Sequence, residues 1–190
     1  LHYEIYVNSI SSILKSIGIN INTVPLLDVV SNKSNKIIGD RSFSSNPNTV
    51  SIIGNHCIKY FSNNKIATVI KHIPGHGSSH LDSHFHTPIV NEAKKNLYKK
   101  DFYPFMKKRS LLAMTAHVVY KKYDPCFSAT HSNILINGII RKHIGFKGIL
   151  ISDDISMKAL GKGLIKNATL ALNSGCNIVL HCSGKINEMR

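Results

Sequence analysis

Apolar residues along the chain follow two different spacings. In residues 6–17 they recur at helical intervals, and Gly18 then follows as a helix stop. Asn46-Pro47 is typical of a helix start, with a capping residue and a proline in the first turn. The helical spacing predicts helices at 6–17, from Pro47 through Phe61, and at 91–108, 132–143 and 164–172. Short apolar runs between them predict strands at 23–29, 66–70, 111–115, 148–151 and 177–180.

Each predicted strand is separated from the next by one helix, which is typical of repeated β-α units and a parallel sheet. The fold class is therefore α/β. Polar residues stand at or just past the carboxyl ends of four of these strands: Asp28, Lys71 with His72, His117 and Asp153. Polar residues also resume at strand ends for no functional reason, but four successive strands favour a shared site at this edge.

Length and composition narrow the class of protein. The 190 residues are 43% hydrophobic and 18% charged, which predicts one globular domain spanning 1–190. The longest apolar runs are too short to cross a membrane, so no membrane partner is expected. The net charge of +14 comes mostly from scattered lysines, so we interpret it as a solvated basic surface in preference to a nucleic-acid-binding face.

Compartment is predicted from the cysteines and the start of the chain. Cys57, Cys126, Cys176 and Cys182 form no C-x-x-C pair and no regular framework, which favours a reducing cytoplasm. The chain begins at Leu1 without a basic segment followed by an apolar one, so no signal peptide is expected. The missing initiator methionine indicates a fragment of a longer protein.

A histidine-rich segment, residues 71–88, holds the densest candidate chemistry. Four of its histidines recur every fourth residue, from His72 to His84, but Pro74 and two glycines prevent the helix that would align them. A zinc site would then need a loop that wraps the metal, and this remains the less favoured alternative. In the other interpretation, Asp82 orients the imidazole of His84, which acts as general acid and then general base.

Two further candidates lie outside this segment. Asp153 directly follows a predicted strand, where a carboxylate can serve as a nucleophile, a metal ligand or a sugar-hydroxyl acceptor. Adjacent acids such as Asp153-Asp154 also occur simply at helix starts. Arg41 lies in a loop after the first strand, and its planar guanidinium suits a carboxylate or sugar hydroxyls.

Several ordered motifs together resemble one family. The run 71–77 followed by Asp82-Ser83-His84 and Pro88 is similar to K-H-F-P-G-H-G-x4-D-S-H-x3-P of the bacterial glycoside hydrolase family 3 β-N-acetylhexosaminidases of the NagZ type. Segments 39–43, 114–117, 145–148 and 152–157 resemble that family's G-D-R-S-F, M-x-A-H, G-F-x-G and S-D-D-L-S-M in the same order. Segments 25–29 and 175–177 match as well.

The resemblance implies a (β/α)8 TIM-type barrel, of which about five of the eight units are present in 1–190 as a partial catalytic barrel domain. It implies retaining hydrolysis with Asp153 as the nucleophile, and with His84, polarised by Asp82, as the acid/base. Arg41, Lys71 and His72 match positions that hold N-acetylglucosamine. No metal or organic cofactor is implied.

By the same resemblance, the expected substrates are N-acetylglucosamine-anhydro-N-acetylmuramic acid saccharides or muropeptides from peptidoglycan, cleaved during cytoplasmic cell-wall recycling. The family segment D-Q-E-G-G-R has no match in this chain. The alternative is therefore a catalytically inactive barrel remnant that keeps some sugar binding.

Overall fold

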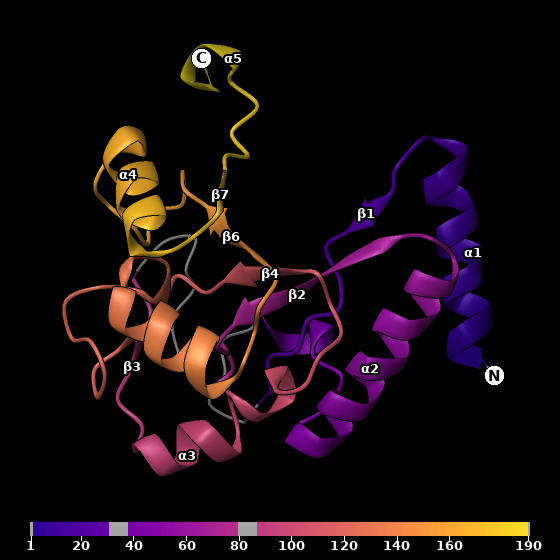
Figure 1. Cartoon of the computed structure of the whole chain (residues 1–190), viewed down its shortest axis with the longest axis horizontal. Helices are drawn as coiled ribbons and strands as arrows, with labels where there is room; N and C mark the ends of the chain where they lie inside the picture. The colour runs from indigo at the N-terminus through magenta and orange to yellow at the C-terminus, as the bar shows by residue number, and fades with distance from the viewer. Residues whose placement is uncertain (1, 31–37, 80–86, 190) are drawn as a thin grey trace.

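A computed structural model describes residues 2–30, 38–79 and 87–189 (Figure 1). Within them, no helix is both long and apolar enough to cross a lipid bilayer. The α-helices are α1 (His2–Ser16), α2 (Pro47–Asn63), α3 (Lys94–Lys99), α4 (Leu164–Ser174) and α5 (Ile186–Met189), with short 3-10 helices η1 (Gly39–Arg41), η2 (Tyr103–Phe105) and η3 (Ala129–His131) and the π-helix η4 (Ile134–His143). The strands are β1 (Ile21–Asn22), β2 (Ala67–Ile73), β3 (Ile89–Val90), β4 (Leu112–Thr115), β5 (Val119–Tyr120), β6 (Ile149–Asp154) and β7 (Ile178–Leu180).

Five of the strands form one parallel sheet in the order β1-β2-β4-β6-β7. The register places Lys71 beside Met114, Met114 beside Ile151 and Ile151 beside Ile178, so the carboxyl ends of the strands share one edge. Strands in this order each need a crossover, and helices supply most of these crossovers. The predicted α/β class and five-stranded parallel sheet are confirmed.

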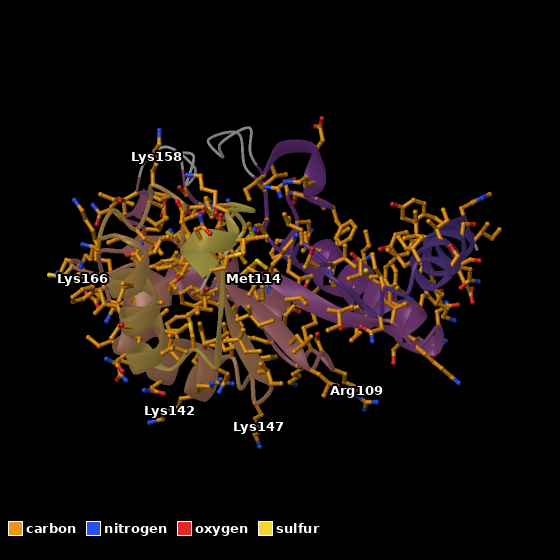
Figure 2. All side chains as sticks on the ribbon, turned by 90° about the horizontal axis from the view of Figure 1, so that it is seen from above. Arg109, Met114, Lys142, Lys147, Lys158 and Lys166 are labelled. Carbon is orange, nitrogen blue, oxygen red and sulfur yellow. The ribbon has the colours of Figure 1, made fainter. Side chains whose placement is uncertain are left out.

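The two faces of the sheet pack against different partners. Ile70, Ala113 and Leu150 belong to the main core, together with Ile58 of α2 and Ile136 of η4. Alternate residues point to the opposite face, where Val69, Leu112 and Met114 form a small separate cluster. Figure 2 shows Met114 near the middle of the molecule. In a closed barrel, this second face would line the interior.

The helix predicted at 91–108 is much shorter in the structure, because α3 ends at Lys99 and the 3-10 helix η2 follows. Pro104 lies in η2 and cannot continue an α-helix. The carboxylate of Asp101 turns away from the helix to bind Ser78, and Phe102 is fully buried. The helical spacing of this lysine-rich segment therefore predicted a longer helix than the structure contains.

The first predicted strand is also displaced. Regular pairing is at Ile21–Asn22, and within 23–29 only Leu26 forms a bridge, to Lys71. Pro25 has no N–H to donate to a ladder, which limits pairing here. A small parallel sheet of β3 and β5 was not predicted, because two-residue strands leave no periodicity to detect.

Candidate active site

Asp28 is the buried centre of the site. Its side chain is completely inaccessible, at the carboxyl edge beside β2. Its Oδ2 accepts a hydrogen bond from Nδ1 of His72 at 2.7 Å, and its Oδ1 accepts one from the backbone N–H of His76 at 2.6 Å. The backbone N–H of His72 lies 3.3 Å from Oδ2. One carboxylate thus orients an imidazole and anchors the loop that follows β2.

Electrostatics keep Asp28 ionised. Burial on its own raises the pKa of this carboxyl, but the nearby His72 and His76 and their hydrogen bonds outweigh burial and hold the pKa below its usual value. An ionised carboxylate can only accept hydrogen bonds, so Nδ1 of His72 carries a proton. This tautomer assignment leaves Nε2 of His72 to face the site.

Nε2 of His72 lies 3.9 Å from Oδ2 of Asp153, which is at the carboxyl end of β6. This is beyond hydrogen-bond range, and the Asp153 side chain is 19% exposed. Asp153 therefore keeps one oxygen open towards the site, while its Oδ1 accepts the backbone N–H of Asp154 at 2.8 Å.

Asp154, the neighbouring acid, has a different role. Its carboxylate accepts the hydroxyl of Ser156 at 2.6 Å and the backbone N–H of Cys182 at 3.0 Å. Burial raises the pKa of Asp154, but these hydrogen bonds, those of Ser156 foremost, hold it below its usual value. Asp154 therefore fixes the turn after β6, and Asp153 is the carboxylate available for chemistry.

His117 supports the same turn from the side of β4. Its Nε2 lies 3.0 Å from the backbone carbonyl of Asp154, and its Nδ1 lies 2.7 Å from the hydroxyl of Thr130. Burial lowers the pKa of His117, which favours a neutral ring with the proton on Nε2. His117 thus positions the backbone next to Asp153.

Arg41 and Lys71 lie close enough to interact electrostatically. Both line a cavity of about 310 Å³, together with Phe43. Burial and the positive charge of Arg41 lower the pKa of Lys71, whereas Asp153 and Asp28 raise it. The hydroxyl of Ser42 binds the backbone carbonyl of Asp28 at 2.7 Å, which ties η1 and its Arg41 to the sheet edge.

The segment after β2 is held at several points. The hydroxyl of Tyr120 donates to the backbone carbonyl of Gly75. Asp101 accepts the backbone N–H of Ser78 at 3.0 Å and its hydroxyl at 2.7 Å. The predicted acid/base residues Asp82 and His84 come next in the chain and lie outside the described residues.

His76 lies against His72, with ring centroids 5.8 Å apart. It is 3% exposed, and burial lowers its pKa to about 4, so the ring is neutral. Among the described residues neither of its nitrogens has a hydrogen-bond partner, and no group of three or more His, Cys, Asp or Glu side chains could hold a metal ion. His80 and His84, the other histidines of the zinc interpretation, lie outside that part of the chain.

The structure therefore brings together most of the predicted residues. Asp28, Lys71 with His72, His117 and Asp153 lie at the carboxyl edge, as the strand-end pattern predicted. Arg41, predicted in a loop after the first strand, lines a cavity with Lys71. What sequence analysis missed is the role of Asp28 as the orienting partner of His72. Their separation of 44 positions gives no local signal, and only the parallel pairing beside β2 brings them into contact.

Comparison with known proteins gives consistent matches. A family described as the glycosyl hydrolase family 3 N terminal domain matches residues 7–190. A beta-hexosaminidase of Thioalkalivibrio sulfidiphilus (strain HL-EbGR7) is 36% identical over 176 residues, covering 90% of this chain and 50% of the relative. The chain thus spans about half the length of the curated relatives that it matches.

Solved structures agree. A family 3 beta-N-acetylglucosaminidase from Paenibacillus sp. str. FPU-7 superposes with a TM-score of 0.89 at 32% identity, covering 94% of this chain and 35% of that one. NagZ from Neisseria gonorrhoeae, solved in complex with N-trifluoroacetyl-D-glucosamine, gives a TM-score of 0.84 at 32% identity, covering 94% and 52%. The incomplete barrel-type fold is confirmed.

Proposed function

Because the chain belongs to glycosyl hydrolase family 3, we propose that it carries the reacting edge of a retaining exo-β-N-acetylglucosaminidase. The observation that carries this proposal is the line of Asp28, His72 and Asp153 along the carboxyl edge of the sheet. It presents an open carboxylate beside an oriented imidazole. The names of the matched relatives, beta-hexosaminidase and beta-N-acetylglucosaminidase, supply the sugar class.

Asp153 is the nucleophile in this proposal. Its free Oδ2 attacks the anomeric carbon of the terminal sugar, a bond forms between that oxygen and the carbon, and the bond to the leaving oxygen breaks. The hydrogen bond from the backbone of Asp154 to Oδ1, together with the support from His117, holds the carboxylate in one orientation. A fixed nucleophile lowers the entropic part of the barrier.

His84, assisted by Asp82, is the acid/base. The imidazolium protonates the leaving oxygen in the first step. In the second step the neutral imidazole takes a proton from a water that attacks the anomeric carbon, and the bond from that carbon to Oδ2 of Asp153 breaks. Both assignments rest on the resemblance of residues 71–88, the segment that contains Asp82 and His84.

Arg41, Lys71 and His72 bind the sugar. The cationic donors Arg41 and Lys71 suit the hydroxyl and acetamide oxygens of N-acetylglucosamine. In the Nδ1–H tautomer of His72, Nε2 is an acceptor and suits the donated hydrogen of a sugar hydroxyl. Within this proposal the substrates are peptidoglycan-derived saccharides, and the reaction takes place in the cytoplasm.

Release of a chromophore from an aryl N-acetyl-β-glucosaminide tests the proposal. Asp153→Asn should lower turnover roughly ten-thousand-fold, as is typical when a nucleophile is removed. Asp124→Asn is the matched control, because Asp124 binds Ser132 and two backbone N–H groups away from the site. Normal turnover by Asp153→Asn would refute the assignment. Sugar binding without turnover in the unsubstituted chain would instead support the inactive remnant.

A further inference from the structure

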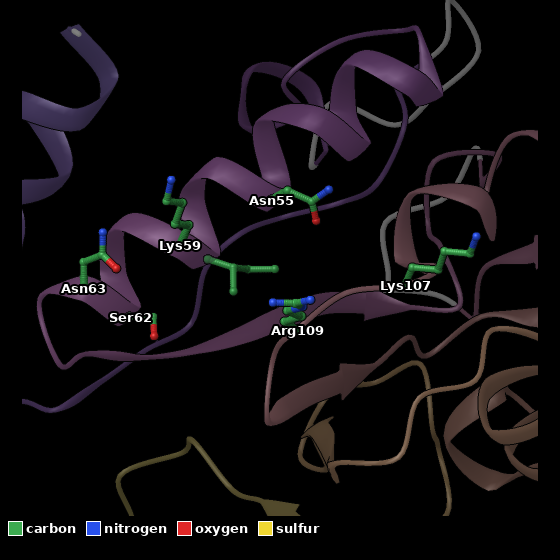
Figure 3. A pocket seen from close by; sticks show the side chains of 7 residues that line it. Asn55, Lys59, Ser62, Asn63, Lys107 and Arg109 are labelled. Atoms are coloured by element: carbon green, nitrogen blue, oxygen red, sulfur yellow. The ribbon is translucent and has the colours of Figure 1, made fainter.

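A second cavity lies at the opposite edge of the sheet from Asp153. It has a volume of about 380 Å³. Its walls are the carboxyl-terminal half of α2, just before β2, and the segment just before β4 (Figure 3). Because β2 and β4 are parallel, these walls meet at the amino ends of the strands. The lining residues are Asn55, Ile58, Lys59, Ser62, Asn63, Lys107 and Arg109.

The charged side chains that line this cavity are all positive. Lys59, Lys107 and Arg109 all line it, and none of its seven lining residues is acidic. Within the described part of the chain, these three cations have no ion pair and no side-chain hydrogen bond. Like charges that line one cavity repel each other, and a bound anion offsets that repulsion.

Lys108, between Lys107 and Arg109, does not line the cavity and has a hydrogen-bond partner. Its amine donates to the hydroxyl of Ser51 at 2.8 Å, and burial lowers its pKa to about 8. Lys107 and Arg109, on either side of it, line the cavity instead. The backbone of Lys107 is left-handed, with φ at 56°, a conformation that costs energy in a residue other than glycine.

The polar groups of the cavity suit an oxyanion. The guanidinium of Arg109 can bind two oxygens of a phosphate through its planar fork, and the lysine amines act as point charges. The side chains of Asn55, Ser62 and Asn63 add neutral donors. The volume lies in the lower part of the range for small-molecule sites, about 300–1,000 Å³, and exceeds what a bare phosphate needs.

We propose that this cavity is a binding site for a small phosphate-bearing anion, formed by Lys59, Lys107 and Arg109 at the amino edge of the sheet. The site is remote from Asp153, so an anion held here does not take part in glycoside cleavage. The proposal therefore does not depend on the proposed glycosidase function, and binding is measurable without turnover.

Titration of the isotope-labelled chain with inorganic phosphate, followed by ¹H–¹⁵N spectra at constant ionic strength, tests the site. We expect signals of Asn55, Asn63 and Arg109 to shift together and to saturate. Arg109→Gln should weaken binding about tenfold or more, the loss expected for a charged hydrogen-bond donor. Lys59→Gln should weaken it as well. The circular dichroism spectra of both variants should be unchanged, because both side chains are exposed.

Lys147→Gln is the matched control. Lys147 is exposed in the loop before β6 and projects on the same side of the molecule as Arg109, whereas Lys158 projects on the opposite side (Figure 2). This variant should leave phosphate affinity unchanged. Equal weakening by Lys147→Gln and Arg109→Gln, or shifts that never saturate, would show general attraction to a basic surface and overturn the proposal.

Two further ligands distinguish the classes of molecule that this cavity could bind. Glucose 6-phosphate should bind at least as well as inorganic phosphate if the extra volume accepts an organic group, and weaker binding would assign the site to the free ion. A short single-stranded oligonucleotide should not compete. Displacement of phosphate by the oligonucleotide at lower concentration would overturn the small-anion proposal in favour of a nucleic-acid surface.

Discussion

Replacing Asp28 by Asn should reverse the tautomer of His72. The carboxylate now accepts the Nδ1–H of His72 at 2.7 Å and the backbone N–H of His76 at 2.6 Å. An asparagine of the same shape would keep its oxygen on the His76 N–H and present an amide donor to His72. Nδ1 must then accept, so the proton of the neutral ring moves to Nε2, the nitrogen that lies 3.9 Å from Asp153.

The stability cost follows from the same contacts. A hydrogen bond to a charged group contributes about 1 kcal/mol more than a neutral one. Two short bonds to Asp28 lose this charge assistance, so Asp28→Asn should lower the free energy of unfolding by about 2 kcal/mol. For a chain of this size that corresponds to a fall in Tm of about 4–8 °C. Asp28→Ala leaves buried donors without partners and should cost about 3–5 kcal/mol.

The ¹⁵N chemical shifts of the His72 ring nitrogens, recorded in mildly alkaline buffer, distinguish the two tautomers directly. Asp124→Asn is the control: it removes another largely buried carboxylate and should lower Tm without changing the His72 ring. An unchanged His72 tautomer in Asp28→Asn would refute the argument that Asp28 orients this imidazole. A fall in Tm alone would not support it.

Two other predictions concern the segment after β2. Burial raises the pKa of Asp101 from 3.8 to about 6, so the folded state keeps a proton that the unfolded chain loses in this interval. Stability should therefore fall by about 3 kcal/mol as pH rises from about 4 to about 6, and Asp101→Asn should abolish this slope in urea titrations. A Cβ at Gly77 would clash with the backbone oxygen of Val29, so Gly77→Ala should lower Tm markedly. Gly138→Ala, where a Cβ meets nothing within 4 Å, should leave Tm unchanged or raise it; equal Tm values for the two alanine variants would contradict the packing argument.

The positions of the candidate residues were largely predictable from local patterns. Lys71, His72 and Asp153 each follow or end a short apolar run, and the carboxyl ends of parallel strands share one edge, so their convergence followed from the β-α repeat. The end of the helix predicted at 91–108 was not predictable, because the contact of Asp101 with Ser78 and the burial of Phe102 override the local helical spacing. The strand predicted at 23–29 is displaced because Pro25 has no N–H to donate to a ladder. The positions of Asp82 and His84 stay predictions.

The sequence by itself determined the parallel α/β class, the family resemblance and the edge at which the chemistry lies, since each follows from the kind and order of residues along the chain. The tertiary structure decided which contacts each of the two acids makes. Asp153 and Asp154 are adjacent and chemically identical in the sequence. Contacts with Ser156, Cys182 and His117 make one a structural carboxylate and leave the other open. The basic cavity likewise exists only because folding brings α2 beside the segment before β4, and no spacing along the chain encodes that meeting.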